Sequence, residues 1–103
     1  MGLMDMLLGS TKKNKIEEMI KNGAIVVDVR TREEFQGGHV AGSTNIPLSE
    51  LNKNIDKLKK MNKPVVLCCA SGARSGQAKN ILSSNGLVDC ENGGGWMRVN
   101  SCM

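Results

Sequence analysis

The chain has 103 residues and a formal net charge of +4 at pH 7, with 40% hydrophobic and 2% aromatic residues. This length holds one small domain with one core, and no apolar run approaches the length of a membrane helix. Phe35 and Trp96 are the only aromatic residues, and most lysines fall on predicted amphipathic helices. We therefore expect neither a nucleic-acid surface nor a membrane partner.

The N-terminus and the cysteines indicate a reducing compartment. Residues 1–10 are apolar but short, carry Asp5, and lack a basic residue before their apolar part, so they do not resemble a secretory signal. The four cysteines show no Cys-x-x-Cys spacing, and His39 is the only histidine. The sequence therefore predicts free thiols, no metal or other cofactor, and a cytoplasmic protein.

Helical and strand patterns alternate from the start of the chain. Residues 1–8 form either a short amphipathic helix or a frayed end, within an N-terminal extension over residues 1–13 of a single domain spanning 1–103. Residues 14–22 place Ile16, Met19 and Ile20 on one helical face, and Gly23 stops the helix. Residues 24–29 are an apolar, β-branched run that predicts a buried strand.

Turn and capping signals divide the next segment. Thr31 and Glu34 form a capping box for a short helix that carries Phe35 and ends at Gly37-Gly38. Residues 44–46 predict a brief strand that Pro47 interrupts. Residues 48–61 predict one or two helical segments, with inward residues Leu51, Ile55 and Leu58.

The most informative stretch is residues 64–86. A short apolar run, Val65 to Cys68, predicts a buried strand, and Ala78, Ile81 and Leu82 lie on one face of a helix that Asn85-Gly86 ends. Between them, residues 69–75 form a loop of small residues with a cysteine at its start. A strand, a small-residue turn and a helix N-terminus bring backbone N–H groups together around an anion. A cysteine there has its thiolate stabilised, so the sequence predicts a nucleophile at Cys69.

The last elements complete an alternating pattern. Residues 87–90 predict a short strand, residues 93–95 a glycine loop that lets the backbone approach another segment closely, and residues 96–99 the start of a terminal turn or helix. Alternating strands and helices of these lengths predict an α/β fold. Its parallel sheet is covered by helices on both faces.

Three blocks of the chain resemble the single-domain rhodanese (thiosulfate sulfurtransferase) family. Residues 69–75 read Cys-x-x-Gly-x-Arg-Ser after a buried strand. Residues 28–47 carry Asp-Val-Arg, then Glu-Phe, then a Gly-His turn that leads to Asn-Ile-Pro. Residues 92–96 read Asn-Gly-Gly-Gly-Trp. The resemblance extends from about residue 16 to residue 99 and implies a three-layer domain with a parallel sheet of four to five strands.

The resemblance also implies a reaction. Cys69 would take a sulfur atom from thiosulfate or a persulfide donor, and a thiol, cyanide or a protein would accept it from the Cys69 persulfide. The substrate-binding residues it implies are Ala70, Ser71, Gly72, Ala73, Arg74 and Ser75, and Asp28 and Arg30 would support the loop. Arg74 either binds the donor's oxyanion or braces the loop against a carboxylate such as Asp28, and Arg30 pairs with Glu33 or Glu34. His39 and Trp96 are expected to be structural.

Two alternatives use the same segment. Counted from Cys68, five residues precede Arg74 and Ser75, which is the spacing of cysteine phosphatases. However, Leu67 rather than a histidine precedes Cys68, and only one of two adjacent strand residues can face the loop. Cys68 is therefore expected in the sheet. A non-enzymatic persulfide relay or interaction module would use the same residues as a free-standing enzyme, so the sequence does not separate them.

Overall fold

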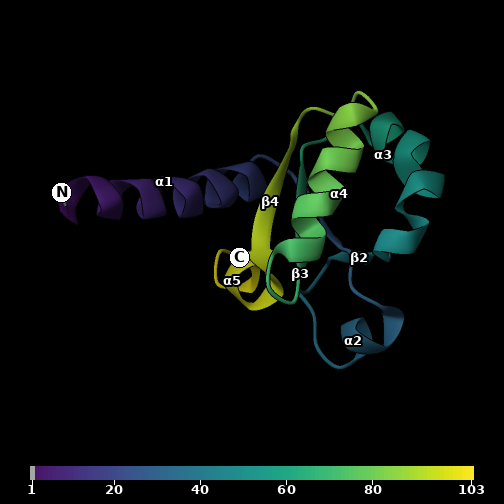
Figure 1. Cartoon of the computed structure of the whole chain (residues 1–103), viewed down its shortest axis with the longest axis horizontal. Helices are drawn as coiled ribbons and strands as arrows, with labels where there is room; N and C mark the ends of the chain where they lie inside the picture. The colour runs from purple at the N-terminus through teal and green to yellow at the C-terminus, as the bar shows by residue number, and fades with distance from the viewer. Residues whose placement is uncertain (1) are drawn as a thin grey trace.

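The computed structural model describes residues 2–103, and the side chains of residues 12–103. Helices and strands alternate along the described chain (Figure 1). Their bounds, in chain order, are α1 Gly2–Lys21, β1 Ile25–Asp28, α2 Arg32–Gln36, β2 Thr44–Asn45, the 3₁₀ helix η1 Leu48–Asn54, α3 Ile55–Met61, β3 Val65–Cys69, α4 Ala73–Ser84, β4 Cys90–Gly95 and α5 Trp96–Asn100.

The described strands form one parallel sheet in the order β2-β1-β3-β4. Parallel strands need crossover segments, and the helices between these strands supply them. The predicted α/β fold with four to five parallel strands is confirmed, with four. Strand β3 lies in the interior of the sheet, and all five of its residues are buried. Both of its faces must therefore pack against other elements.

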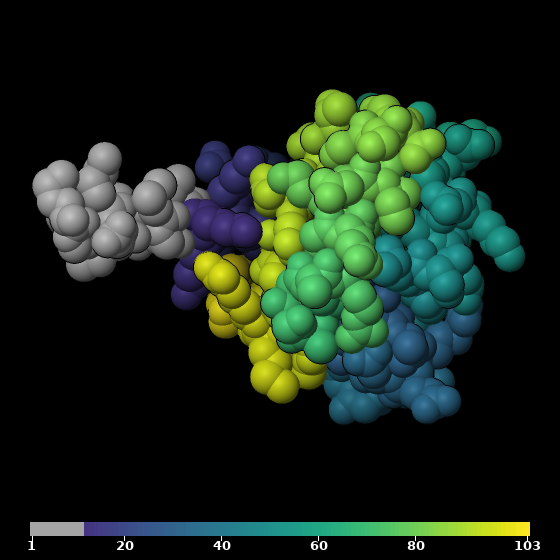
Figure 2. Space-filling model, in the orientation of Figure 1, coloured from purple at the N-terminus to yellow at the C-terminus, as the bar shows by residue number. Residues whose placement is uncertain are grey.

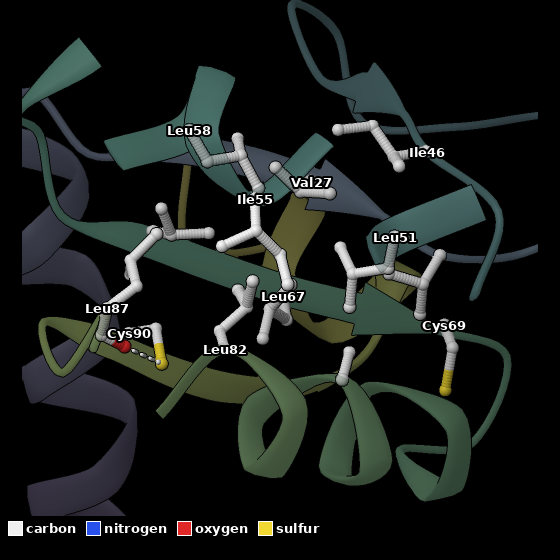
Figure 3. Packing of buried hydrophobic residues seen from close by; sticks show 13 residues of the cluster. Val27, Ile46, Leu51, Ile55, Leu58, Leu67, Cys69, Leu82, Leu87 and Cys90 are labelled. Atoms are coloured by element: carbon white, nitrogen blue, oxygen red, sulfur yellow. Dashed lines mark hydrogen bonds between the residues drawn. The ribbon is translucent and has the colours of Figure 1, made fainter. Parts of the chain in front are cut away.

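Alternate residues of β3 point into two separate cores. Val65, Leu67 and Cys69 belong to the larger core, which packs under η1, α3 and α4 (Figure 3). Val66 and Cys68 belong to the smaller core on the opposite face, with Ile16 from α1 and Val99 from α5. The predicted inward residues of η1 and α3 are buried, as are Ala78 and Leu82 of α4. The prediction of helices on both faces is confirmed.

The N-terminal helix is longer than its pattern suggested. Helix α1 is continuous over Gly2–Lys21, whereas the sequence predicts a helix over residues 14–22 and either a short helix or a frayed end over residues 1–8. Its end is as expected: Gly23 has φ +90°, a conformation that favours glycine and stops a helix. The predicted amphipathic character of residues 1–8 concerns side chains that lie outside the described part of the chain.

The C-terminal strand corrects two predictions. The predicted strand over residues 87–90 and the predicted glycine loop over residues 93–95 are both wrong, because the strand is β4, Cys90–Gly95. It pairs with β3, and the register shifts between Leu67 and Cys68. A Cβ on Gly93 would lie 2.6 Å from Val99 Cγ2 and 2.9 Å from Val66 Cγ1. The close approach expected of these glycines is thus confirmed, but it occurs inside the sheet.

Candidate active site

The candidate site lies at the carboxyl end of β3. Cys69 is the last residue of the strand, and residues 70–72 connect it to α4, which begins at Ala73. Gly72 has φ +101°, so the turn into the helix uses a conformation that other residues rarely adopt. We call residues 69–75 the Cys69 loop. Figure 2 shows α4 crossing the front of the molecule, with β4 and α5 on one side and η1 and α3 on the other.

The sulfur of Cys69 points to the side of the sheet that α4 covers (Figure 3). The Gly72 N–H donates to Cys69 Sγ at 2.9 Å, and Ser75 Oγ lies 3.4 Å from the same atom. Burial by itself raises the pKa of this thiol. The Ser75 hydroxyl and the N–H groups of Ser75, Gly72 and Ser71 outweigh burial, so the pKa of Cys69 lies below that of an ordinary cysteine. The predicted convergence of N–H groups is therefore present around this sulfur.

Cys68 occupies the opposite face of the sheet. Its side chain is fully buried in the smaller core, among apolar residues. Burial, reinforced by the nearby Asp28 carboxylate, raises the pKa of Cys68 to about 12. A neutral thiol that faces away from the Cys69 loop cannot act as its nucleophile. The phosphatase alternative needs Cys68 in the loop, and the structure contradicts that placement.

The residues at the mouth of the Cys69 loop are small. Ala70, Ser71 and Ala73 are exposed, while Cys69 itself is 1% exposed. Any molecule that reaches the sulfur must therefore pass between backbone groups and short side chains. A hollow beside the loop is lined by Val29, Thr31, Pro47, Leu48, Ser49 and Arg74.

Arg74 braces the loop against helix α2. Its guanidinium donates two hydrogen bonds to the Glu34 carboxylate, from Nη1 at 2.7 Å and from Nη2 at 2.9 Å. Of the two readings of Arg74, the structure shows the bracing one, with Glu34 rather than Asp28 as the partner. The predicted capping box of α2 is also present, because Thr31 and Glu34 bond each other's backbone N–H groups. Glu34 therefore both caps the start of α2 and joins this helix to the Cys69 loop.

Asp28 and Arg30 form a buried ion pair behind the site. Arg30 Nη2 lies 2.7 Å from Asp28 Oδ2, and the two residues are 4% and 0% exposed respectively. The prediction that Arg30 pairs with the carboxylate of Glu33 or Glu34 is wrong. The Arg30 guanidinium donates a hydrogen bond only to the main-chain oxygen of Glu34, and its other hydrogen bonds go to Asp28 and to the carbonyl of Gly38. Trp96 stacks over the guanidinium at 5.0 Å, which fits its expected structural place.

Asn92 of β4 belongs to the site, although the block of residues 92–96 predicts no role for its side chain. Its side chain accepts a hydrogen bond from Ser75 Oγ at 2.7 Å and donates one to the carbonyl of Gly72 at 3.1 Å. Gly72 also packs against Gly94, because a Cβ on Gly72 would lie 3.4 Å from Gly94 Cα. The glycine-rich strand thus holds the back of the Cys69 loop. Only the pairing of β4 with β3, which the sequence did not predict, brings Asn92 there.

Among the described side chains, no three His, Cys, Asp or Glu residues gather as they would around a metal ion. No helix within the described residues combines the length and hydropathy needed to span a membrane. All four cysteines are free thiols in this structure.

The fold and the site define a parallel α/β protein with a cysteine at the centre of converging backbone N–H groups. The model of the rhodanese-like domain matches residues 12–100, so the chain belongs to the rhodanese-like family. The thiosulfate sulfurtransferase PspE of Escherichia coli K12 is 44% identical over 70 residues, which cover 67% of each protein.

One further sequence relative and one solved structure are also similar to much of this chain. The uncharacterized protein YqhL of Bacillus subtilis 168 is 40% identical over 83 residues, which cover 78% of this chain and 65% of YqhL. A solved structure of a rhodanese with anions from E. coli superposes with a TM-score of 0.68 at 40% identity, over 74% of this chain and 91% of that one. The chain thus spans about two thirds of the length of PspE and of YqhL.

Proposed function

We propose that this protein is a sulfurtransferase that carries sulfur as a persulfide on Cys69. The observation that carries the proposal is the position of Cys69 Sγ, which receives the Gly72 N–H at 2.9 Å and has a lowered pKa. A lowered pKa favours the thiolate, and attack by a thiolate needs no separate general base. Membership in the rhodanese-like family and the similarity to PspE support the same reaction class.

In the first step, the Cys69 thiolate attacks the outer sulfur of thiosulfate. A new S–S bond forms to Cys69, the S–S bond of the donor breaks, and its electron pair leaves on sulfite. Cys69 then carries a persulfide whose outer sulfur is anionic. The N–H groups of residues 70–75 and the N-terminus of α4 supply the positive field that stabilises this charge.

In the second step, an acceptor thiolate or cyanide bonds to the outer sulfur, and the Cys69 thiolate leaves. Ala70, Ser71 and Ala73 at the loop mouth leave room for the acceptor, whereas Gly72, Arg74 and Ser75 hold the loop in shape. Asp28 and Arg30 support that shape from behind. The physiological acceptor is a small thiol or a protein thiol, and location in the cytoplasm stays a prediction of the sequence.

A turnover assay tests the proposal. The wild-type protein is expected to form thiocyanate from thiosulfate and cyanide, and Cys69→Ser is expected to reduce this to background. Cys68→Ser is the matched control, because the adjacent thiol faces the other core and should be dispensable. Hydrolysis of a phosphate ester without thiocyanate formation would contradict the proposal and restore the phosphatase alternative.

A further inference from the structure

Three hydrogen bonds fix the orientation of the Asn92 amide. Nδ2 donates to the carbonyl of Gly72 at 3.1 Å, and Oδ1 accepts the N–H of Gly94 at 2.9 Å. Oδ1 is therefore also the atom that lies 2.7 Å from Ser75 Oγ. Because a carbonyl oxygen has no hydrogen, Ser75 must be the donor of that bond.

Ser75 has one hydroxyl proton and two neighbours that can accept it. Its oxygen lies 2.7 Å from Asn92 Oδ1 and 3.4 Å from Cys69 Sγ, and the residue is fully buried. While the proton is on the Asn92 side, the Ser75 oxygen can only accept from the S–H group of a neutral Cys69 thiol. A Cys69 thiolate accepts a hydrogen bond from the Ser75 hydroxyl only if that hydroxyl turns away from Asn92. The two acceptors therefore compete.

We propose that Asn92 is a positioning residue for sulfur transfer, whose amide oxygen competes with the sulfur of Cys69 for the hydroxyl proton of Ser75. In the free thiolate, the charge on Sγ draws the proton away from Asn92. In the persulfide, the negative charge lies on the outer sulfur, and the Ser75 hydroxyl again donates its hydrogen bond to Asn92. When the acceptor removes the outer sulfur, Ser75 turns back and stabilises the departing Cys69 thiolate.

This competition acts within a constant charged environment. The charged side chain that acts on Cys69 is that of Arg74, which Glu34 pairs. The Asp28–Arg30 ion pair at the end of the neighbouring strand β1 acts on Cys68 instead, because Asp28 lies in register with Cys68. The adjacent Cys68 is neutral at ordinary pH, since its pKa is raised to about 12. None of these groups contacts Asn92 directly, so substitutions at Asn92 leave them in place.

The competition predicts the direction of a change in the Cys69 pKa. In Asn92→Leu, a substitution of similar shape, Ser75 loses the competing acceptor and donates to the thiolate alone. The pKa of Cys69 is expected to fall by about half a unit to one unit, the worth of one neutral hydrogen bond. A residue that merely supports the loop would act in the opposite direction, because a loosened loop withdraws N–H groups from the sulfur.

The pKa is measured from the thiolate absorbance at 240 nm as a function of pH, after subtraction of the matching Cys69→Ser protein. The same Asn92→Leu change is then made in the Ser75→Ala background, where no proton remains to compete for. In each background, the change in the Cys69 pKa that Asn92→Leu causes is determined. The proposal expects this change to be more negative by at least half a pKa unit with Ser75 present than in the Ser75→Ala background. Equal responses in the two backgrounds would overturn it, even if the substitution also loosens the loop.

Asn85→Ala is the matched control at the other end of α4. Asn85 likewise donates its amide to a main-chain carbonyl, that of Ile81, but it is far along the helix from Cys69. It should leave the Cys69 pKa unchanged. The proposal rests on the proposed function for its role in catalysis, but the titration itself requires no sulfur transfer. A protein without thiocyanate formation could therefore still show the Ser75-dependent response, and the two failures are distinguishable.

Discussion

Arg74 and Glu34, 40 positions apart in the sequence, join the Cys69 loop to helix α2 through two hydrogen bonds of 2.7 and 2.9 Å. This bidentate pair compensates the only charged side chain in the Cys69 loop. The pKa of Glu34 is lowered to about 2, first by its bonds with Arg74 and then by those with Thr31. The positive field at the loop therefore comes mainly from backbone groups.

Replacement of Glu34 by Gln should improve the binding of an anionic donor. Glutamine can keep the capping box of α2, but it leaves the Arg74 guanidinium uncompensated beside the loop. We expect the KM for thiosulfate to fall by about threefold at low ionic strength, with the difference shrinking as salt is added. Glu50→Gln is the control, because it frees Arg32 away from the loop. A KM that rises, or an equal fall in the control, would contradict an electrostatic effect of the unpaired Arg74 on the donor.

Replacement of Asp28 by Asn should destabilise the whole domain. It leaves the Arg30 guanidinium almost fully buried without its carboxylate, which costs about 3–5 kcal/mol in the free energy of unfolding. Urea unfolding at pH 7 measures this loss. The double substitution Asp28→Asn with Arg30→Met removes the unpaired charge and should recover part of it. If the double variant is no more stable than Asp28→Asn, the lost ion pair is not the cause.

Replacement of Gly93 by Ala tests the close approach inside the sheet. The added Cβ would lie 2.6 Å from Val99 Cγ2 and 3.0 Å from the carbonyl oxygen of Leu67. Overpacking of this kind costs about 1–3 kcal/mol. Gly37→Ala is the control, because Gly37 has φ −73° and its Cβ would meet only ordinary contacts. Equal unfolding midpoints for the two variants would argue against the register of β4.

The fold should lose stability in acid through Glu91. Burial by itself raises the pKa of Glu91, but its ion pairs with Lys15 of α1 and Lys79 of α4 hold it at about 2, below the ordinary 4.5. The unfolded chain therefore binds a proton first as the pH falls. The stabilisation is fully present above about pH 4.5 and is lost toward pH 2. Between pH 7 and pH 3, urea unfolding should show a smaller loss in the free energy of unfolding for Glu91→Gln than for the wild type. The same dependence on pH in both proteins would contradict this.

Local patterns predicted much of the fold because their causes are local. The buried run of β3, the capping box at Thr31 and Glu34, and the helix stops at Gly23 and Gly86 depend on neighbours within a few residues. The position of Cys69 between a strand end and a helix start followed from the same kind of signal. Its contacts with Gly72 and Ser75 lie inside that one loop.

The features that sequence reasoning missed depend on distant segments. Strand β4 contains three glycines, which disfavour strands in isolation, and it forms because β3 and α5 pack against it. The sequence leaves two roles open for Arg74 and predicts the wrong partner for Arg30, since several carboxylates lie at suitable spacings. Only the tertiary structure selects Glu34 for one arginine and Asp28 for the other. Asn92 joins the site for the same reason.

Sulfur uptake by the protein itself tests the central claim most directly. Wild-type protein, Cys69→Ser and Cys68→Ser would each be exposed to thiosulfate and examined by intact mass spectrometry. We expect wild type and Cys68→Ser to gain the mass of one sulfur atom that cyanide removes, and Cys69→Ser to gain none. Uptake that survives in Cys69→Ser, or that is lost in Cys68→Ser, would contradict the assignment of Cys69 as the sulfur carrier.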